Sequence, residues 1–528
     1  MKELHFPPYR LDIANEQLWR EEQLIALRPK TFAILRYLVA HPNRLVTKEE
    51  LLHAVWGDTL VSEEGLRDYL REIRHALGDD AEAPQFIETV RGRGYRFLPT
   101  ITTQPVSSSR FQVPSFTSSL VPSPQPLASS TALPLPDKPS IIILPFVNLS
   151  NDPEQEYFSD GITEDLTNSL SRLASLFVIS RTSAFTYKGK LTKVQDISKE
   201  MGVQYVLEGS VRRSDTQVRV SAQLIDAIAD HHLWAERYDR PLTDIFAVQD
   251  EIVQKITTAL AVKLTTGEEV RLTRFPTSNL EAYDHFLRGM EQYLRFQKDA
   301  NIQARRLFAR AIELDPQYAA AYALLSWTHW TDWYSQWASG TFPLERAFET
   351  AQQAVALDDS LPSAHMILGI IYLYQKQHER ALTEAERALA ANPNDADAYW
   401  TLGYILNMAG RPEDAIRAVK TAMRLNPYYP PYYPFDLGRA YRFLGQSEKA
   451  ITALKEALVH NPNFLPARLQ LAGVYSELDR KEEAQAEAAE ILRFSPNFSL
   501  QAHRQSVPYK DPAILERYID SLRKAGLK

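Results

Sequence analysis

The chain has 528 residues, of which 45% are hydrophobic and 24% charged. At roughly 100–200 residues per domain this length predicts several domains, and the composition excludes fibrous and wholly disordered classes. Cysteine is absent and the net charge is −7, which excludes disulfide scaffolds and sulfur-ligated zinc and limits any nucleic-acid site to a local basic patch.

The first 98 residues begin with strands and continue with helices. Alternating apolar stretches at 6–13 and 17–27 predict strands, and helical spacing follows over 29–40. Thr47 and Glu50 form a capping box that predicts the start of a second helix.

A third helix is predicted after Ser62, with two distinct faces. Its apolar face consists of Leu66, Leu70, Ile73 and Leu77. The same spacing, one position later, gives the basic residues Arg67, Arg71 and Arg74. One face is therefore expected to pack and the neighbouring face to be cationic.

A hairpin is predicted after this helix. Strands at 86–90 and 95–98 flank a turn that contains Arg91 and Arg93 separated by glycine. Arginines on such a narrow tip suit a minor groove. The preceding helix would lie in the major groove, where Arg67 and Arg71 would read base edges and Arg74 would hold phosphate.

This order of elements resembles the OmpR/PhoB-type winged-helix domain of transcription regulators. The matching runs are Val55-Trp56-Gly57, Leu66 to Leu77, and Glu88 to Arg96. The resemblance implies that Trp56 and Thr89 contact the DNA backbone and that Arg91 enters the minor groove. The other residues expected at the DNA are Arg67, Asp68, Arg71, Arg74, Arg93 and Tyr95.

Two features of residues 1–98 moderate the expected affinity. Glu72 stands where many relatives have a basic residue. The net charge of this region is −2, so we expect modest nonspecific attraction to DNA. The alternative interpretation is that the three helix arginines form a solvated face.

Residues 99–139 are interpreted as a linker, because they contain nine prolines and nine serines but only three charged residues. Residues 140–270 are interpreted as a mixed α/β domain. Strands are predicted at 141–146 and 176–180, with a helix at 162–173 between them.

The α/β domain is also predicted to contain a hairpin, with strands at 203–212 and 218–224, and a final helix over 243–264. It resembles the TolB amino-terminal-like domain in the runs Leu144 to Phe146, Tyr157 to Gly161, Leu207 to Arg212 and Leu233 to Tyr238. That resemblance implies no catalytic activity.

A period of 34–35 residues, with a first interval of 43, marks residues 280–528. The recurring steps are Asp315-Pro316, Asp358-Asp359, Asn392-Pro393, Asn426-Pro427, Asn461-Pro462 and Ser495-Pro496. In phase with them, small residues recur at two positions: Ser326, Gly369, Gly403, Gly438 and Ala472, and then Ala347, Ala381, Ala415, Ala450 and Ala484. This pattern resembles tetratricopeptide repeats, which implies a helical solenoid that binds a protein or peptide.

Four tryptophans recur at helical spacing beside the longer first interval: Trp327, Trp330, Trp333 and Trp337. The first interpretation is packing between helices. The second is an aromatic groove for a partner or effector.

The predicted fold is multidomain: an α+β winged helix, an α/β domain and an all-α repeat solenoid. The combination resembles the CadC, ToxR and HilA-like regulators, although no apolar run in the linker approaches the ~20 residues of a membrane span. We therefore expect a cytoplasmic one-component transcription regulator without enzymatic activity or cofactor. Its expected partners are double-stranded promoter DNA, a protein or peptide bound by the repeats, RNA polymerase and a second copy of the chain.

Two alternatives remain. The first is an interaction scaffold whose winged helix binds protein. The second is a nucleotide-utilising enzyme, which the lack of a phosphate-binding loop motif disfavours.

Overall fold

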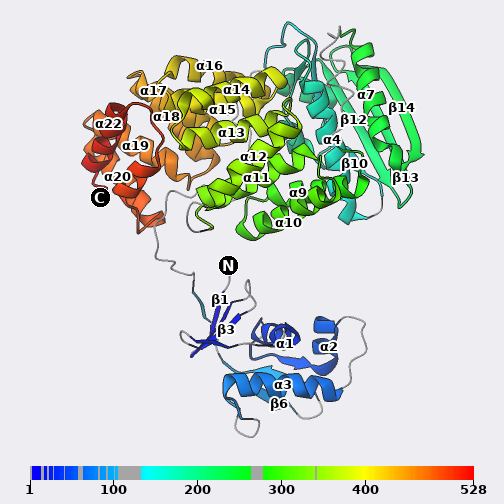
Figure 1. Cartoon of the computed structure of the whole chain (residues 1–528), viewed down its shortest axis with the longest axis vertical. Helices are drawn as coiled ribbons and strands as arrows, with labels where there is room; N and C mark the ends of the chain where they lie inside the picture. The colour runs from blue at the N-terminus through cyan, green and yellow to red at the C-terminus, as the bar shows by residue number, and fades with distance from the viewer. Residues whose placement is uncertain are drawn as a thin grey trace. The chain divides into compact units, whose positions relative to one another are not determined.

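The computed structural model divides the chain into two compact units, Met1–Arg110 and Phe111–Lys528. It describes residues 3–6, 8–12, 17–20, 23–25, 27, 29–40, 42–56, 63–80, 84–90, 93–99, 102–104, 133–150, 152–262, 277–338 and 342–528. Figure 1 shows the elements of each unit.

The first unit combines two small antiparallel sheets with a group of helices. The first sheet has the strand order β4-β3-β2-β1-β8 and the second the order β5-β7-β6. The strands are β1 (Glu3–Phe6), β2 (Tyr9–Asp12), β3 (Gln17–Arg20), β4 (Gln23–Ile25), β5 (Leu45–Thr47), β6 (Ile87–Val90), β7 (Gly94–Phe97) and β8 (Thr102–Gln104). The helices are α1 (Pro29–Ala40), α2 (Lys48–Trp56) and α3 (Glu63–Leu77).

The helical predictions for this unit are confirmed. The hydroxyl of Thr47 accepts a hydrogen bond from the Glu50 backbone N–H at 3.1 Å, as an N-cap should. The four apolar residues predicted on α3 are all buried: Leu66, Leu70, Ile73 and Leu77. They pack with Phe32 of α1 and Phe97 of β7 in one core.

The first unit extends further than the predicted boundary at residue 98. Strand β8 falls inside the predicted linker and pairs antiparallel with β1, with Glu3 opposite Gln104. A Thr-Thr-Gln strand shows no apolar alternation, so sequence periodicity misses it, and backbone pairing to an edge strand holds it instead.

The second unit begins with an α/β domain. Its sheet has the order β11-β9-β12-β13-β14, and β10 also pairs with β12. The strands are β9 (Ser140–Ile143), β10 (Val147–Asn148), β11 (Phe177–Val178), β12 (Tyr205–Arg213), β13 (Gln217–Asp226) and β14 (His231–Pro241). The helices are α4 (Glu156–Ser171), α5 (Arg181–Ala184), α6 (Val194–Met201) and α7 (Ile245–Ala259).

The hairpin predicted in this domain is confirmed as the antiparallel pair β12–β13. Helix α4, however, begins six residues before the predicted start at Ile162. Gly161, one residue before the predicted start, therefore lies inside the helix. A Cβ atom there would lie 2.5 Å from a methyl carbon of Leu287, so the glycine permits close helix packing.

The remainder of the second unit is a solenoid of paired helices (Figure 1). The helices are α9 (Leu280–Tyr293), α10 (Lys298–Leu314), α11 (Ala319–Tyr334), α12 (Phe342–Leu357), α13 (Pro362–Tyr374), α14 (His378–Ala391), α15 (Ala396–Met408), α16 (Pro412–Leu425), α17 (Tyr432–Phe443), α18 (Ser447–His460), α19 (Leu465–Glu477), α20 (Lys481–Phe494), α21 (Leu500–Ser506) and α22 (Pro512–Lys524).

The small residues that recur in the repeats lie where paired helices approach. A Cβ atom on Gly369 would lie 3.2 Å from the carbonyl oxygen of Ala381, and one on Gly438 would lie 3.2 Å from that of Ala450. In the irregular repeat, the hydroxyl of Ser326 donates to the carbonyl oxygen of Ala347 at 2.6 Å. The recurring small residues therefore let the paired helices approach closely.

The α/β domain binds the first solenoid helix through buried polar groups. Tyr157 of α4 donates its hydroxyl to Asp284 of α9 at 2.5 Å. The hydroxyl of Tyr283, also on α9, donates to Asp165 of α4. Burial raises the pKa of Asp165 to about 6 although this hydrogen bond opposes the shift.

A second contact lies further along the solenoid, at loops that follow α14 and α16. The Asn394 amide nitrogen donates to the carbonyl oxygens of Ser171 and Leu173, both at 2.9 Å. The hydroxyl of Ser183 donates to the Asn426 side-chain oxygen at 2.6 Å. The domain therefore bridges the first helix pair and two later loops.

Arg424 strengthens this second contact and also holds the end of the predicted linker. Its guanidinium donates to the carbonyl oxygens of Met201, Gly202 and Pro134.

Among the described residues, no helix combines the length and apolar character needed to cross a membrane.

Candidate nucleic-acid interface

Helix α3 presents part of its basic side to solvent. Because Leu70 and Ile73 are buried in the core, the positions between them point away from it. Arg71 is exposed at such a position. A guanidinium there is well suited to phosphate or to base edges.

Arg74, one turn further along α3, has a different environment. Its Nη2 donates to the carbonyl oxygen of Ile87 at 2.9 Å and to the hydroxyl of Thr89 at 2.8 Å. Its Nε lies 4.0 Å from a carboxylate oxygen of Asp79, and only 15% of the Arg74 side chain is exposed. The guanidinium therefore joins α3 to strand β6.

Asp79 anchors the start of the same strand. Its fully buried carboxylate accepts hydrogen bonds from the backbone N–H groups of Gln85, Phe86 and Ile87 at 2.7–3.0 Å. A carboxylate that replaces its hydration with three backbone donors holds the chain in one conformation. The base of the hairpin is therefore fixed relative to the end of α3.

The hairpin itself is the antiparallel pair β6–β7, with Thr89 opposite Tyr95. Across its turn, the Arg93 N–H donates to the carbonyl oxygen of Val90 at 3.0 Å. A Cβ atom on Gly94 would lie 2.0 Å from the Val46 carbonyl oxygen of strand β5. Only glycine lets these two strands approach so closely.

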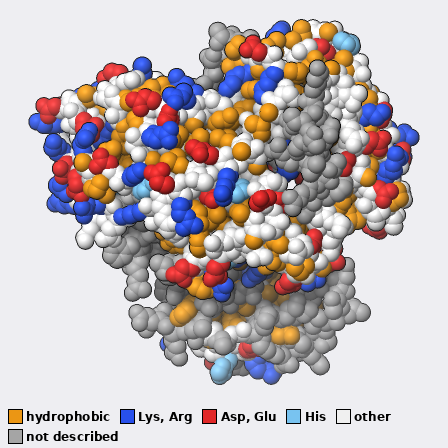
Figure 2. Space-filling view, turned by 45° about the horizontal axis from the view of Figure 1, so that its top comes forward, with side chains coloured by type: hydrophobic (Ala, Val, Ile, Leu, Met, Phe, Trp, Pro, Cys, Tyr) orange, Lys and Arg blue, Asp and Glu red, His pale blue; other side chains and the backbone are white. Residues whose placement is uncertain are grey.

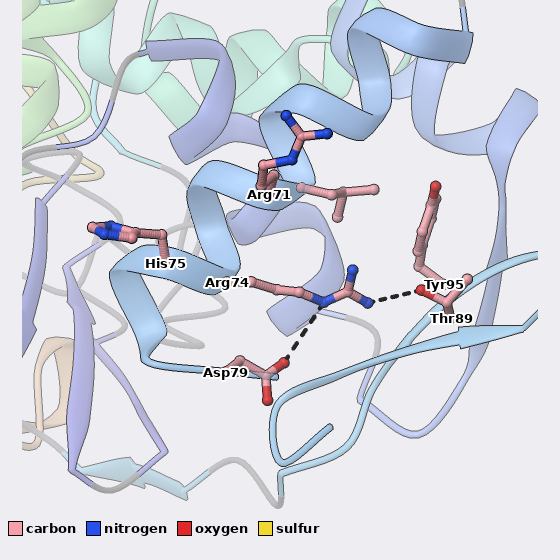
Figure 3. A pocket seen from close by; sticks show the side chains of 7 residues that line it. Arg71, Arg74, His75, Asp79, Thr89 and Tyr95 are labelled. Carbon is pink, nitrogen blue, oxygen red and sulfur yellow. Dashed lines mark hydrogen bonds and ion pairs between the residues drawn. The ribbon is translucent and has the colours of Figure 1, made fainter. Parts of the chain in front are cut away.

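A cavity of about 530 Å³ lies between α3 and the hairpin. Figure 3 shows the side chains of α3 on one wall and those of the hairpin on the other. The lining residues are Leu70, Arg71, Arg74, His75, Asp79, Thr89 and Tyr95. The lining thus combines two arginines and a histidine with one acidic residue, Asp79, and Arg71 is the exposed arginine among them.

The structure brings Arg71, Arg74, Thr89 and Tyr95 together around this cavity. Arg93 is exposed nearby in sequence, at the hairpin turn. Tyr95 is only 5% exposed and belongs to the core. Arg91 lies outside the described residues, as do the side chains of Trp56, Arg67 and Asp68.

Sequence reasoning missed His75 and Asp79, which both line the cavity. His75 lies in the last turn of α3, directly after Arg74, and so falls outside the spacing that relates Arg71 to Arg74. Asp79 follows Gly78, whose φ of +59° ends the helix. An acidic residue directly after such a glycine indicates a side chain that accepts hydrogen bonds from backbone N–H groups later in the chain.

The tryptophan pattern in the repeats is only partly a helical stripe. Trp337 lies beyond the end of α11 at Tyr334, so the predicted single face is wrong for this residue: the helix stops before reaching it. The indole N–H of Trp327 donates to the carbonyl oxygen of Ser363 at 3.3 Å. Trp330 stacks on Tyr334 with ring centroids 4.7 Å apart.

Trp333 packs edge-on against Tyr374 of α13, with ring centroids 5.2 Å apart. It keeps intermediate exposure. Trp327 and Trp330 pack against the core of the solenoid. Trp327 and Trp330 have the same intermediate exposure as Trp333, so all three are partly buried and pack against neighbouring side chains.

Known family models match one region in the amino-terminal part of the chain and two in the carboxy-terminal part. Residues 21–97 match the family model "Transcriptional regulatory protein, C terminal". The first unit carries an OmpR/PhoB-type DNA-binding domain. Residues 368–430 and 444–504 match tetratricopeptide repeat models, so the predicted solenoid is confirmed at the level of sequence families as well.

Three relatives illustrate the similarity. The transcriptional regulator HilA of Salmonella typhi is 24% identical over 363 residues, which are 67% of this chain and 58% of that protein. The phosphate regulon regulatory protein PhoB of Escherichia coli is 33% identical over 88 residues, which are 16% of this chain and 38% of PhoB.

A protein named "Putative adenylate cyclase 3", from Rhizobium meliloti, is 47% identical over 256 residues. These residues are 48% of this chain and 43% of that relative. The chain thus spans about half the length of the curated relatives that it matches over long stretches.

Proposed function

We propose that the chain is a transcription regulator that binds promoter DNA through α3 and the β6–β7 hairpin. In this proposal Arg71, with Arg67 and Asp68 on the same helix, meets the major groove. Arg91 and Arg93 reach the adjacent minor groove from the hairpin turn, and Trp56 contacts the DNA backbone.

The cavity between α3 and the hairpin is the observation that carries this proposal. Arg71 and His75 lie on its helix wall, and Thr89 lies on its hairpin wall (Figure 3). A DNA strand that passes from one groove to the next presents its phosphates between two such elements. The exposed guanidinium of Arg71 on the helix wall matches the chemistry of phosphate.

Salt dependence of DNA binding tests the proposal. Fragments of the source genome retained by the full chain would be identified, and affinity for one such duplex measured by fluorescence anisotropy at several salt concentrations. The logarithm of affinity should fall linearly with the logarithm of salt concentration, by about 0.9 for each phosphate neutralised.

Arg71→Ala should weaken binding and reduce this slope by about one. Arg36→Ala, which removes an exposed arginine from α1, is the matched control and should leave the slope unchanged. If the unaltered chain retained no DNA at any salt concentration, the proposal would be wrong.

We further propose that the repeats receive the signal, through a protein or peptide that contacts the surface around Trp333. Residues 140–270, as a TolB amino-terminal-like domain, would hold the repeats in shape. The contacts of Asn394 and Arg424 with this domain support such a role. Indole emission of a Trp333→Phe variant, compared with the unaltered chain, would identify an effector that binds there.

The remaining parts of the proposal concern assembly and chemistry. Promoter binding in the cytoplasm would involve RNA polymerase and a second copy of the chain, each measurable by sedimentation on promoter DNA. We propose that the chain itself acts by binding and not by catalysis. Formation of a cyclic nucleotide from labelled ATP by the purified chain would contradict this.

A further inference from the structure

Arg71 and Arg74 have equivalent spacing in the sequence but different surroundings in the structure. Arg71 is exposed, whereas 85% of the Arg74 side chain is covered, since its exposed fraction is 15%. Figure 3 shows the Arg74 side chain extending from α3 toward the hairpin. The two arginines therefore have different tasks.

The hydrogen bonds of Arg74 reach two residues of one strand. Ile87 and Thr89 are separated by one residue on β6, and Ile87 contributes its backbone carbonyl oxygen whereas Thr89 contributes its side-chain hydroxyl. One nitrogen of Arg74, Nη2, donates both to the Ile87 carbonyl oxygen and to the Thr89 hydroxyl. To reach a phosphate with this nitrogen, Arg74 would have to give up both bonds.

Asp79 supports this arrangement from the other side of the guanidinium. It lies 4.0 Å from the Arg74 Nε and holds three backbone N–H groups at the start of β6. Arg74, in the last turn of α3, and Asp79, just after that helix, both bond to residues at the start of the hairpin and so join the helix to it.

We propose that Arg74 is a positioning residue for DNA binding, which sets the hairpin at the correct angle to α3 instead of neutralising a phosphate. The Thr89 hydroxyl acts with it as an acceptor. This inference rests on the proposed function, because the angle matters only if both elements meet one duplex. It assigns to Arg74 and Thr89 a role different from the direct DNA contact implied by family resemblance.

The test combines affinity, salt slope and a double-mutant cycle in the full chain. Arg74→Gln and Thr89→Val should each weaken DNA binding by about tenfold, the equivalent of one good hydrogen bond. Their effects should not add in the double variant, because each removes the same interaction. The salt slope should stay close to that of the unaltered chain, whereas Arg71→Ala lowers it by about one.

A measurement without DNA supplies an independent readout. Amide hydrogen exchange of residues 87–97 should accelerate in both Arg74→Gln and Thr89→Val, because the hairpin loses its tie to α3. Arg71→Ala should leave this exchange unchanged. Thr89→Val removes only the hydroxyl that accepts from Arg74 and keeps a side chain of similar size, so it keeps the test valid if Arg74→Gln fails to fold.

The inference would be overturned if Arg74→Gln lowered the salt slope as much as Arg71→Ala, or if the two effects were additive with hairpin exchange unchanged. Failure of the proposed function gives a different result. In that case the unaltered chain shows no salt-dependent DNA binding, while the hairpin still loosens in Arg74→Gln.

Discussion

The contact between the α/β domain and the solenoid offers a sharp test, because the repeats provide their own control. Asn394 and Asn463 occupy equivalent positions in two repeats, each two residues after a periodic asparagine. In both loops the periodic asparagine accepts a hydrogen bond from the backbone N–H of this residue, at 3.2 and 3.0 Å. The two positions differ mainly in the presence of the α/β domain at Asn394.

We expect Asn394→Ala to destabilise the second unit by about 2–3 kcal/mol. The amide of Asn394 is 4% exposed and donates to two carbonyl oxygens, of Ser171 and Leu173. Each lost hydrogen bond costs about 0.5–1.5 kcal/mol, and carbonyl groups left buried without a donor cost more. Asn463 is exposed, so Asn463→Ala should change stability by no more than about 0.5 kcal/mol.

Urea denaturation followed by circular dichroism would compare the two variants with the unaltered chain. Hydrogen exchange at the end of α4 would locate the effect, because only Asn394→Ala should release amides near residue 171. Equal losses of stability in the two variants would refute the reasoning. So would an Asn394→Ala protein that unfolds like the unaltered chain.

Two further outcomes follow from single residues. Gly94→Ala should destabilise the winged helix by about 3 kcal/mol or more, measured by thermal unfolding, since the new Cβ would lie 2.0 Å from the Val46 carbonyl oxygen. Burial lowers the pKa of His365, but hydrogen bonds to Glu384 and to the Asp359 carbonyl oxygen outweigh it and raise the pKa above its usual value. Because the pKa is higher in the folded state, protonated His365 stabilises the fold fully below pH about 6.5, and this stabilisation is lost as pH rises through the folded-state pKa. The stability lost in His365→Gln, measured by urea denaturation, should therefore be largest in acid and shrink toward alkaline pH.

The repeat architecture could be predicted from the sequence because its cause is local and periodic. Close approach of two helices requires a small residue at each crossing, and Gly369 and Ala381, one from each recurring series, meet at such a crossing. The same holds for the buried face of α3, where each apolar residue lies one turn from the next. Such patterns repeat within a few residues and are visible without any contact map.

The positions of individual polar side chains could not be predicted in this way. Arg71 and Arg74 satisfy the same spacing, and only the strand that packs beside α3 makes one exposed and the other covered. The start of α4 differs from the predicted start for a similar reason. Gly161 resembles a helix boundary in sequence, but Leu287, which is far away along the chain, explains it.

Contacts between the α/β domain and the solenoid have no signature in the sequence. Asn392 and Asn426 belong to the same periodic series as Asn461. The first two bond to Ser171 and Ser183 of the α/β domain, whereas Asn461 bonds within its own loop. A residue conserved in a repeat pattern for helix termination can thus acquire a second task that only tertiary structure reveals.

The surface of the second unit adds a constraint on its partners. Figure 2 shows acidic and basic side chains interspersed over the visible face of the carboxy-terminal helices, among hydrophobic ones. Many of these charges are paired along one helix, as between Arg493 and Glu490. A partner of the repeats is therefore expected to be selected by shape and apolar contact more than by net charge.

The α/β domain contacts the solenoid at α9 and again at the loops that follow α14 and α16. It therefore connects parts of the solenoid that are several repeats apart. Because the solenoid is held at two places, its pitch between them cannot change without loss of the hydrogen bonds at one of these contacts. If the repeats bind a partner as proposed, their pitch is set before binding, so little conformational entropy would be lost on binding. A ligand that demanded another pitch would have to rupture buried hydrogen bonds, which makes curvature itself a filter for what can bind.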